Sequence, residues 1–437
     1  MGESGMQGRS GANLPGWTQR RTDGSRTRRP LIRRLTKSAA ILLALPVLVV
    51  GLAVETAAAT GAGTITNHTG TGIDNPYGIT AGPNGALWFT NFGNNSIGEI
   101  TTTGTVSNFT GTGINEPIDI VTGPNGALWF TNYGNNSIGE ITTTGTVSNF
   151  TGTGINKPIG IAAGSNGALW FTNQGNNSIG EITTSGTVSN FTDSSIVTPY
   201  AITAGPNNAL WFTNQNPSGV SSIGEITTTG TVSAFTNAGI TNPYGITAGP
   251  DGALWFTNIP GSSGSSAIGR ITTAGMVTNI YTGATVSNPV SIATGTDGNL
   301  WFVNNGNNSI GAITTGGAIS NYTSATISGP IWIAAGSDGA LWFTNNGDTS
   351  VGRVTTNVTP SVKHFTPTSG PVGQNVTITG KNLAGATQVT FNGKKAKIVS
   401  DTATQIVAKV KAGSTTGPIT VTTSAGTATS KTSFTVT

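Results

Sequence analysis

A segment of about forty residues is repeated seven times along most of this chain. The tripeptide Leu-Trp-Phe marks each copy, and its Trp is residue 88, 129, 170, 211, 255, 301 and 342. The intervals between them are 41, 41, 41, 44, 46 and 41 residues. A repeat of this length is one supersecondary unit that cannot bury its own apolar face, so neighbouring copies must stack. The period therefore predicts a closed ring of stacked units, a seven-bladed β-propeller.

Each copy consists of four short β-rich runs joined by tight turns. In the first copy, YGITAG is followed by an Asn-Gly turn, and ALWFTN, SIGEITTT and TVSNFT supply three further runs. Asn-Gly is the strongest short hairpin signal, and β-branched and aromatic residues favour a pleated, buried surface. No stretch of the repeat has the periodicity of a helix. The sequence thus predicts an all-β fold whose first strands, rich in Gly and Ala, lie closest to the ring axis.

The seventh copy lacks its fourth strand. After Trp342 the chain runs through SVGRVTT at 350–356 and then leaves the pattern, whereas a spare fourth strand, GTITNHT at 63–69, precedes the first copy. We expect this N-terminal strand to pair beside 350–356, because that closes the ring without an open sheet edge. His68 is expected to take the place of Asn108 in an outer strand. Both His68 and His364 are interpreted as exposed histidines that belong to no triad or metal site.

Two segments flank the propeller, which is expected to span residues 60–357. Residues 1–59 combine nine basic residues with an apolar run at 39–54 and three alanines at 57–59, which predicts a secretory signal peptide with a long basic n-region. The run is short for a membrane-spanning helix, so we expect a secreted or cell-surface protein with no membrane span after processing; an uncleaved anchor is the alternative. Residues 358–437 hold short alternating strands, typical of a small Ig-like β-sandwich.

The charges of the chain are divided among these three parts. Residues 1–59 carry a net +6, residues 60–357 have three basic and 12 acidic residues (−9), and residues 358–437 have eight Lys and one Asp (+7), which together give +4. The basic pI therefore reflects the N-terminal segment, and no nucleic-acid partner is expected. The alternatives for the lysines of the tail are a solvated face, contact with an anionic surface polymer, or docking on the oppositely charged propeller. The chain has no Cys, which excludes thiolate catalysis and thiolate metal sites.

Differences between the copies are confined to one face of the predicted ring. Because strands alternate in direction, the turns after strands two and four share this face, and the turns after strands one and three hardly change. Each first strand opens with a proline, which we call the opening proline. The residues that vary after it are Tyr77, Ile118, Ile159, Tyr200, Tyr244, Val290 and Ile331, then Gly78, Asp119, Gly160, Ala201, Gly245, Ser291 and Trp332. A binding site needs such asymmetry, and loops on a rigid scaffold usually carry it.

We expect a ligand site at the mouth of the ring channel, on blades seven, one and two. The residues predicted to form it are Tyr77, Phe92, Glu116, Asp119, Tyr133 and Trp332. Flat aromatic rings suit stacking on sugars or peptides, and carboxylates accept hydrogen bonds from hydroxyls or amines. The competing interpretation is that these side chains simply plug the channel. The sequence predicts no metal site and no cofactor.

The repeated motifs PYGITAGPNGALWFTN and SIGEIT resemble those of the streptogramin B lyases, the virginiamycin B lyase family, over residues 63–357. Members of this family open cyclic depsipeptide antibiotics by a Mg²⁺-assisted elimination. The resemblance implies a His after the opening proline in blades six and seven, a Glu before that proline in blade seven, and a second Glu after the Trp-Phe of blade seven. It also implies a Tyr in blade one, which is present as Tyr77.

The other family positions hold different residues here. Val290 and Ile331 replace the two His, Gly329 replaces the first Glu, and the second Glu position falls at Asn345 or Asn346. Elimination needs a group that takes the proton and a cation that holds the developing charge. We therefore expect an extracellular binding protein for a glycan, peptide or cell-envelope polymer. The alternatives are a lyase that uses Mg²⁺ with Asp119, Glu116 or Asp338, and a structural spacer.

The tail contains TPTSGPVGQNVTITGKNLAGATQVTFNG followed by AGSTTGPITVTTSAGTAT, a pattern that resembles the IPT/TIG family. This resemblance implies an Ig-like fold. In exported bacterial proteins such domains commonly serve as spacers or binding modules.

Overall fold

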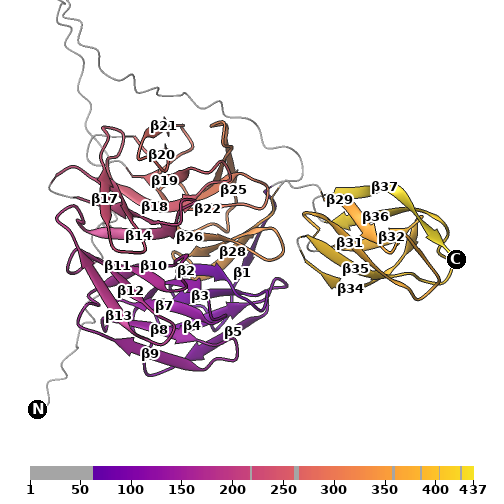
Figure 1. Ribbon diagram of the computed structural model, residues 1–437, viewed down its shortest axis with the longest axis horizontal. Helices are drawn as coiled ribbons and strands as arrows, with labels where there is room; N and C mark the ends of the chain where they lie inside the picture. Colours follow the sequence, from indigo (N-terminus) through magenta and orange to yellow (C-terminus); the bar gives the residue numbers. More distant parts are fainter. Residues whose placement is uncertain are drawn as a thin grey trace, which may run out of the picture. The chain divides into compact units, whose positions relative to one another are not determined.

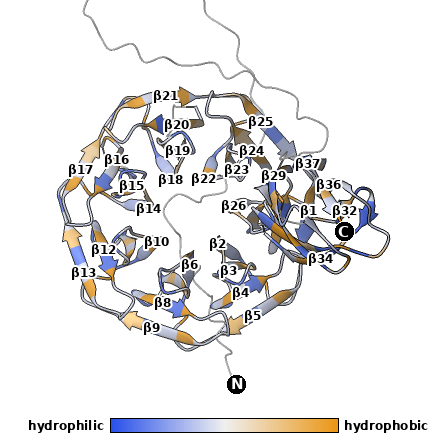
Figure 2. Cartoon of the chain, turned by 45° about the vertical axis from the view of Figure 1, so that its right-hand side comes forward, coloured by the Kyte–Doolittle hydropathy of each residue, from blue (hydrophilic) through white to orange (hydrophobic). Residues whose placement is uncertain are grey.

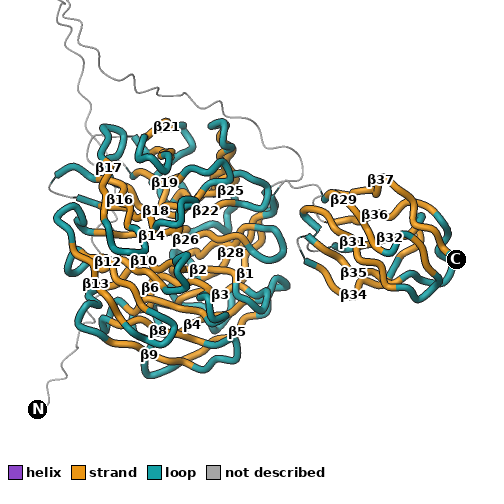
Figure 3. The backbone as a smooth tube through the Cα atoms, in the orientation of Figure 1, coloured by secondary structure: helices purple, strands orange, loops and turns teal. Residues whose placement is uncertain are grey.

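The computed structural model describes residues 63–216, 219–259, 265–356, 360–383, 386–402, 404–423 and 426–437. The regular elements in these ranges are all β-strands (Figures 1 and 3). No helix there is long and apolar enough to cross a membrane. The predicted signal peptide at 1–59, the linker at 357–359 and parts of two insertions, 217–218 and 260–264, lie outside the described residues.

Seven four-stranded antiparallel sheets form the blades of the propeller, arranged as a ring (Figure 2). The strands of blades one to three are β2 (Pro76–Ala81), β3 (Leu87–Asn91), β4 (Ser96–Ile100) and β5 (Val106–Thr110); β6 (Pro117–Thr122), β7 (Leu128–Asn132), β8 (Ser137–Ile141) and β9 (Val147–Thr151); β10 (Pro158–Ala163), β11 (Leu169–Asn173), β12 (Ser178–Ile182) and β13 (Val188–Thr192). Those of blades four to seven are β14 (Pro199–Ala204), β15 (Leu210–Asn214), β16 (Ser222–Ile226) and β17 (Val232–Phe235); β18 (Pro243–Ala248), β19 (Leu254–Asn258), β20 (Ala267–Ile271) and β21 (Val277–Tyr281); β22 (Pro289–Thr294), β23 (Leu300–Asn304), β24 (Ser309–Ile313) and β25 (Ile319–Thr323); β26 (Pro330–Ala335), β27 (Leu341–Asn345), β28 (Ser350–Val354) and β1 (Ile65–His68).

The first strand of each blade lies innermost, as predicted, and touches the first strands of both neighbouring blades (Figure 2). Two glycines show how close this approach is. A Cβ on Gly78 would lie 2.6 Å from the carbonyl oxygen of Ile118 in the next blade, and one on Gly160 would lie 2.7 Å from the carbonyl oxygen of Tyr200. Real Cβ atoms do not come this near to a backbone oxygen, so these positions require glycine where the inner strands crowd the axis.

The repeated Trp residues fill the spaces between blades. Trp88 of blade one packs in a cluster with Leu128, Phe130 and Ile141 of blade two, and the seven equivalent Trp side chains are at most 1% exposed. In six blades the Trp also stacks on a Phe or Tyr of its own outer strand, as Trp88 does on Phe109 with ring centroids 5.2 Å apart. The apolar core is therefore built from contacts that no single copy can make alone.

Polar side chains of the repeat serve its turns. Asn91, which follows Trp-Phe-Thr, accepts a hydrogen bond from the backbone N–H of Asp74 at 3.0 Å and donates to the carbonyl of Gly72 at 2.8 Å. Asn84 accepts from the Trp88 indole N–H and donates to the exposed Glu99 carboxylate at 2.7 Å. The repeated Glu residues are thus solvent-facing partners of a turn.

The N-terminal strand closes the ring, as predicted. β1 pairs antiparallel with β28, from Ile65 opposite Val354 to His68 opposite Val351. The prediction for His68 was wrong, because this register puts Asn67 in the place of Asn108 and His68 in the place of the stacked Phe109. The His68 ring is half-buried and stacks on Trp342 with centroids 5.4 Å apart. His364, by contrast, is exposed, as expected.

The C-terminal sandwich contains two sheets. The first has the order β29 (Ser361–Thr366), β31 (Asn375–Lys381), β35 (Gln405–Lys409) and β34 (Lys397–Asp401); the second has β30 (Ser369–Gly370), β37 (Gly426–Val436), β36 (Gly417–Thr423), β32 (Gln388–Phe391) and β33 (Lys394–Lys395). Its core includes Phe365, Ile378, Phe391 and Phe434. The stretch from Gln388 to Val399 is not one continuous strand. It turns at Asn392-Gly393, and the chain then crosses to the other sheet at Ala396.

Candidate binding site at the channel mouth

The variable positions are brought together by a backbone hydrogen bond that recurs in every blade. The residue after the second strand donates its N–H to the carbonyl of the residue before the opening proline. Examples are Phe92 to Asn75 and Tyr133 to Glu116, both at 3.1 Å. The turn after strand two and the start of strand one therefore lie side by side on the face where the sequence varies.

Several residues before the opening proline are held in the left-handed backbone region. Glu116 has a φ of 46°, Lys157 of 48° and Thr198 of 46°. Such values are uncommon for residues other than Gly and Asn and disfavoured before proline, so the surroundings must hold them. An Asn side chain of the preceding blade does so, since Asn95 accepts the N–H of Glu116 at 2.7 Å and Asn136 that of Lys157 at 2.8 Å. The backbone on this face is therefore held in a defined conformation, which restricts where the side chains of Glu116 and Lys157 can lie.

Tyr77 and Phe92 form one aromatic pair in blade one. Their ring centroids lie 5.3 Å apart with the rings tilted by 39°. Both side chains are partly exposed, and burial raises the pKa of the Tyr77 hydroxyl above its usual value. The hydroxyl therefore remains protonated at neutral pH and acts there as a neutral hydrogen-bond donor or acceptor.

Glu116 and Tyr133 lie together between blades two and three, with Lys157. The Lys157 Nζ sits 4.3 Å from the centroid of the Tyr133 ring, a cation–π contact. Burial, and then the nearby Glu116 carboxylate, raise the pKa of Tyr133. The three side chains place a positive charge, a negative charge and an aromatic ring within one small region of the mouth.

Asp119 lies deeper, at 8% exposure, and is already engaged by the backbone. Its Oδ1 accepts the N–H of Ile120 at 2.8 Å, and its Oδ2 accepts that of Ile161 in the next blade at 3.0 Å. Burial raises the pKa of Asp119 to about 7, although both hydrogen bonds favour the ionised form. Ser291 makes a similar, longer link, accepting the N–H of Ile333 at 3.4 Å. Asp119 thus joins two blades, and its carboxyl group titrates near neutral pH.

A cavity of about 80 Å³ lies within the channel beside these residues. Asp119, Tyr200, Ser291 and Trp332 are among the residues that line it. Tyr200 meets Tyr244 edge-on with centroids 4.9 Å apart, and burial raises the pKa of Tyr200 well above its usual value. Smaller contributions to that increase come from Tyr244, Tyr77 and Asp119.

The six predicted residues therefore fall into three groups on one face. Tyr77 pairs with Phe92, Glu116 lies near Tyr133, and Asp119 shares the channel cavity with Trp332. The aromatic side chains of this set are half-buried. The binding interpretation treats them as exposed, so this point needs correction. Sequence reasoning did not assign Lys157, Tyr200 or Tyr244 to the site. Their signal was present, because all three flank an opening proline where other copies hold different residues.

The positions where the family resemblance implies catalytic groups are apolar or structural. Val290 and Ile331 are each 2% exposed. Asn345 is fully buried and donates to Thr326 and Ser350, like the equivalent Asn of other blades, and Asn346 donates to Asn75. Within the described residues no three His, Cys, Asp or Glu side chains are grouped so that they could hold a metal ion.

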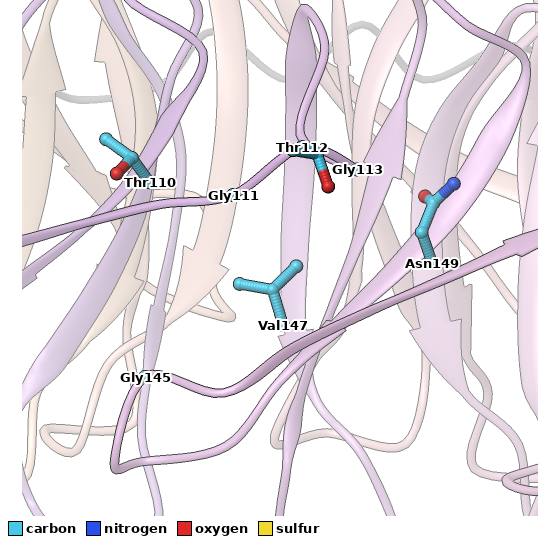
Figure 4. A pocket seen from close by; sticks show the side chains of 7 residues that line it. All are labelled: Thr110, Gly111, Thr112, Gly113, Gly145, Val147 and Asn149. Atoms are coloured by element: carbon cyan, nitrogen blue, oxygen red, sulfur yellow. The ribbon is translucent and has the colours of Figure 1, made fainter.

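A second, wider groove of about 490 Å³ opens at the outer rim between blades one and two (Figure 4). It is lined by Thr110, Gly111, Thr112, Gly113, Gly145, Val147 and Asn149. The same close contact recurs one blade further on, where a Cβ on Gly154 would lie 2.7 Å from that of Asn190, as one on Gly113 would lie 2.6 Å from that of Asn149. The groove is thus a feature of the repeat, whereas the channel mouth differs from blade to blade.

The sequence model of the virginiamycin B lyase family matches residues 63–264 and 192–382. The chain belongs to this family. The IPT/TIG domain model matches residues 360–436. No curated protein matches the sequence.

Solved structures of family members share the propeller. A streptogramin B lyase is 32% identical, with a TM-score of 0.60, over 67% of this chain and 97% of that one. Virginiamycin B lyase from Staphylococcus aureus is 34% identical, with a TM-score of 0.59, over 67% and 98%. A catalytically inactive histidine-to-alanine variant of that enzyme, solved with quinupristin, is 32% identical, with a TM-score of 0.60, over 67% and 99%.

Proposed function

We propose that this chain is an extracellular binding protein whose channel mouth contacts a glycan, a peptide or a cell-envelope polymer. The supporting observation is a contrast between two sets of aromatic side chains. The Trp and Phe of the seven Leu-Trp-Phe motifs are at most 1% exposed, whereas Tyr77, Phe92 and Tyr133 keep part of their surface in water. Partly exposed rings beside a cavity suit stacking on sugar or peptide groups.

Polar groups beside these rings supply the hydrogen bonds that such a ligand needs. Glu116 and Lys157 offer an acceptor and a donor next to Tyr133, and the Tyr77 hydroxyl adds a third polar group. Their backbones are fixed by the turn contacts described above, so little conformational freedom is lost on binding. The extracellular location rests on the predicted signal peptide at 1–59.

A binding role is favoured over the lyase activity of the family because of two positions. The resemblance implies a His at residues 290 and 331, and a family member becomes inactive when one histidine is replaced. This chain has Val290 and Ile331 there, both buried, and the one His described in the propeller stacks on Trp342 in the outer strand of blade seven. Neither Val nor Ile can take a proton.

The alternative, a streptogramin B lyase with other groups, is supported by family membership. Two of its three candidate carboxylates, Asp119 and Asp338, have structural partners, however. Asp338 pairs with Arg353 at 2.7 Å and accepts from the Trp342 indole, and Asp119 accepts two backbone N–H groups. Incubation of the protein with a streptogramin B depsipeptide and Mg²⁺ should leave the ring intact by mass spectrometry. Ring-opened product that disappears in Tyr77→Phe or Asp119→Asn would overturn the proposal.

The binding proposal is tested with an array of glycans, peptides and cell-envelope polymers. We expect retention of a ligand by the wild-type protein and its loss in the double variant Phe92→Ala/Tyr133→Ala. The double variant should keep its stability within about 1 kcal/mol, since it removes partly exposed rings. Met276→Ala, at an exposed position in the turn after strand three, is the control and should bind normally. Normal binding by the double variant, or its early unfolding, would remove this site.

A further inference from the structure

Five lysines gather at one end of the C-terminal sandwich. They are Lys394 and Lys395 in β33, Lys397 at the start of β34, Lys409 at the end of β35, and Lys411 in the turn that follows. All five side chains are exposed. We call this group the lysine end.

Two of these lysines face each other directly. In the antiparallel pair of β34 and β35, Lys397 is the register partner of Lys409. Directly opposed residues of neighbouring strands project from the same side of the sheet, with Cβ atoms about 5 Å apart. Like charges in this arrangement lower the stability of a sheet. The fold therefore keeps an unfavourable pair where a neutral residue would suit it better.

The rest of the lysine end is held in place by a tight turn. Asn392 and Gly393 take positive φ values of 46° and 83°, which shape the hairpin between β32 and β33. The Asn392 amide donates to the Thr415 hydroxyl at 2.9 Å and to the Thr416 carbonyl at 3.1 Å. These bonds fix the hairpin against the segment after Lys411.

Lys394 lies against the same segment. Its Nζ is 3.4 Å from where a Cβ on Gly413 would stand, and the Ser414 N–H donates to the Lys411 carbonyl at 3.0 Å to close that turn. The hairpin and the turn thus bring lysines from β33, β34 and β35 to one surface.

Acidic residues are scarce around this surface. The salt bridges Arg270–Asp251 and Arg353–Asp338 both lie in the propeller. Asp401 is the one acidic residue at 358–437, and it stands at the far end of β34, about 13 Å along the strand from Lys397. Its carboxylate accepts the backbone N–H of Ala386 at 2.8 Å. The five lysines of this end therefore outnumber the single acidic residue of the domain.

We propose that the lysine end binds a linear polymer that carries phosphate groups. The segment 358–437 contains eight Lys and no Arg. Lys binds phosphate as a compact point charge on a flexible stem, whereas Arg recognises single carboxylate or phosphate groups by planar, two-point contacts. A row of exposed lysines around a fixed end matches a flexible chain of closely spaced phosphates. The inference is independent of the channel mouth, because it concerns other residues in another domain.

The propeller is a poorer partner for this surface, although it carries a net charge of −9. Its acidic residues are distributed among the blades and have partners of their own. Glu99 accepts from Asn84, Asp251 pairs with Arg270, and Asp338 pairs with Arg353. The ion pairs neutralise Asp251 and Asp338, and the remaining carboxylates are spread over the blades.

The test compares two double variants of the full-length chain with equal changes in charge. Lys397→Gln/Lys409→Gln removes the facing pair, and Lys363→Gln/Lys381→Gln removes two exposed lysines of the same domain. Lys381 lies at the other end of β31, about 20 Å along the strand from the partner of Lys409. Binding to inorganic polyphosphate is measured over a range of salt concentrations. The basic residues of 1–59 are present in every variant, so the difference between variants reports on the sandwich.

We expect the Lys397/Lys409 variant to bind polyphosphate about tenfold more weakly near 0.1 M salt, with a log–log salt slope lower by about 1.4, because two phosphate contacts are lost. The control variant should change less than about twofold. The Tm of the Lys397/Lys409 variant should stay the same or rise, which separates lost contacts from lost folding. Equal losses in both variants would overturn the proposal, as would stronger binding to polyglutamate, double-stranded DNA or anionic phospholipid vesicles.

Discussion

Blades one to six and blade seven reach the same structure by different routes. In the first six, four strands follow one another along the chain, whereas in blade seven β1 joins three strands from the far end of the propeller. The polar contacts of blade seven nevertheless match those of blade one. Asn108 accepts from Asn91 at 3.1 Å and Ser96 at 2.7 Å, and Asn67 accepts from Asn345 at 3.2 Å and Ser350 at 2.9 Å. The contacts within a blade, and not the continuity of the chain, define it.

The two kinds of blade differ at one aromatic contact. The outer strand of blades one to six stacks a Phe or Tyr on the repeated Trp, whereas blade seven stacks His68. Burial, and then the charge of Arg353, lower the pKa of His68, and its Nε2 is buried without a hydrogen-bond partner among the described residues. Among the rings that stack on the repeated Trp residues, that of the closing strand is thus the one that can become charged in acid.

The largest effect is expected from removing the closing strand. A chain that begins at residue 71 loses the β1–β28 pairing and leaves Asn345 and Ser350 without Asn67. We expect a loss of more than about 4 kcal/mol in urea unfolding, beyond the usual range for a single substitution. A chain that begins at residue 60 serves as the control. Equal stability of the two truncated chains would mean that closure contributes nothing.

Equivalent polar contacts should have equivalent energies in the two kinds of blade. Asn67→Ala and Asn108→Ala each remove an acceptor that two buried or partly buried groups share. We expect a cost of about 1–2 kcal/mol for each, measured by urea unfolding. A much smaller cost for Asn67→Ala would show that the closing strand is held less tightly than the outer strands that follow the third strand of their blade along the chain.

The acid sensitivity of blade seven should be transferable to blade one. Phe109→His replaces a ring that stacks on Trp88 by one that takes up a proton. We expect a cost of about 1 kcal/mol at pH 8 from weaker packing, and a larger cost at pH 5 from burial of the charged ring, reduced by the attraction of Glu99, which stands where Arg353 does in blade seven. Thermal unfolding at the two pH values measures both. The same cost at each pH would indicate that the outer stacking position does not discriminate against a charged ring.

The smallest effect is expected from the reverse change, His68→Phe. The pKa of His68 is lower in the folded state than its usual 6.5, so the unfolded state takes up a proton first as the pH falls. The free energy of unfolding is therefore unaffected by this His above pH 6.5. It decreases as the pH falls from 6.5 to the folded-state pKa, because only the unfolded state takes up the proton in that range. The variant should be at least as stable as the wild type at pH 8, and its advantage should grow by no more than about 1 kcal/mol between pH 8 and pH 5 because the half-exposed site is screened. A constant difference in Tm across this range would contradict the assignment.

The sequence was sufficient to predict the fold because the same pattern of strand and turn residues occurs in all seven copies. The positions of Trp, Gly and Asn-Gly predicted the blades, and the missing strand after Val354 predicted closure by residues 63–69. One-residue accuracy was harder to reach. His68 was assigned to the place of Asn108, although the register puts it opposite Val351 and onto Trp342.

The site was less predictable because its contacts join different blades. The link from Asp119 to the N–H of Ile161, the Tyr200–Tyr244 contact and the Lys157–Tyr133 contact each depend on how neighbouring inner strands are placed. Sequence spacing identifies the variable positions, but it does not show which of them meet across the channel. For the same reason, it marked Asp119 as a hydrogen-bond acceptor without showing that the backbone already occupies both oxygens.

The pairing of β1 with β28 has a consequence for how the molecule is made. A hydrogen bond from the backbone of Thr64 to the side chain of Thr355 joins residues 291 positions apart. Long separation adds little to the equilibrium cost of closing a loop, but it makes the contact form late. During synthesis from the N-terminus, β1 is made first, and its partner β28 is made only after nearly the whole propeller. A chain that stops before β28 leaves β1 without a partner. Only a chain that includes β28 can therefore close the ring.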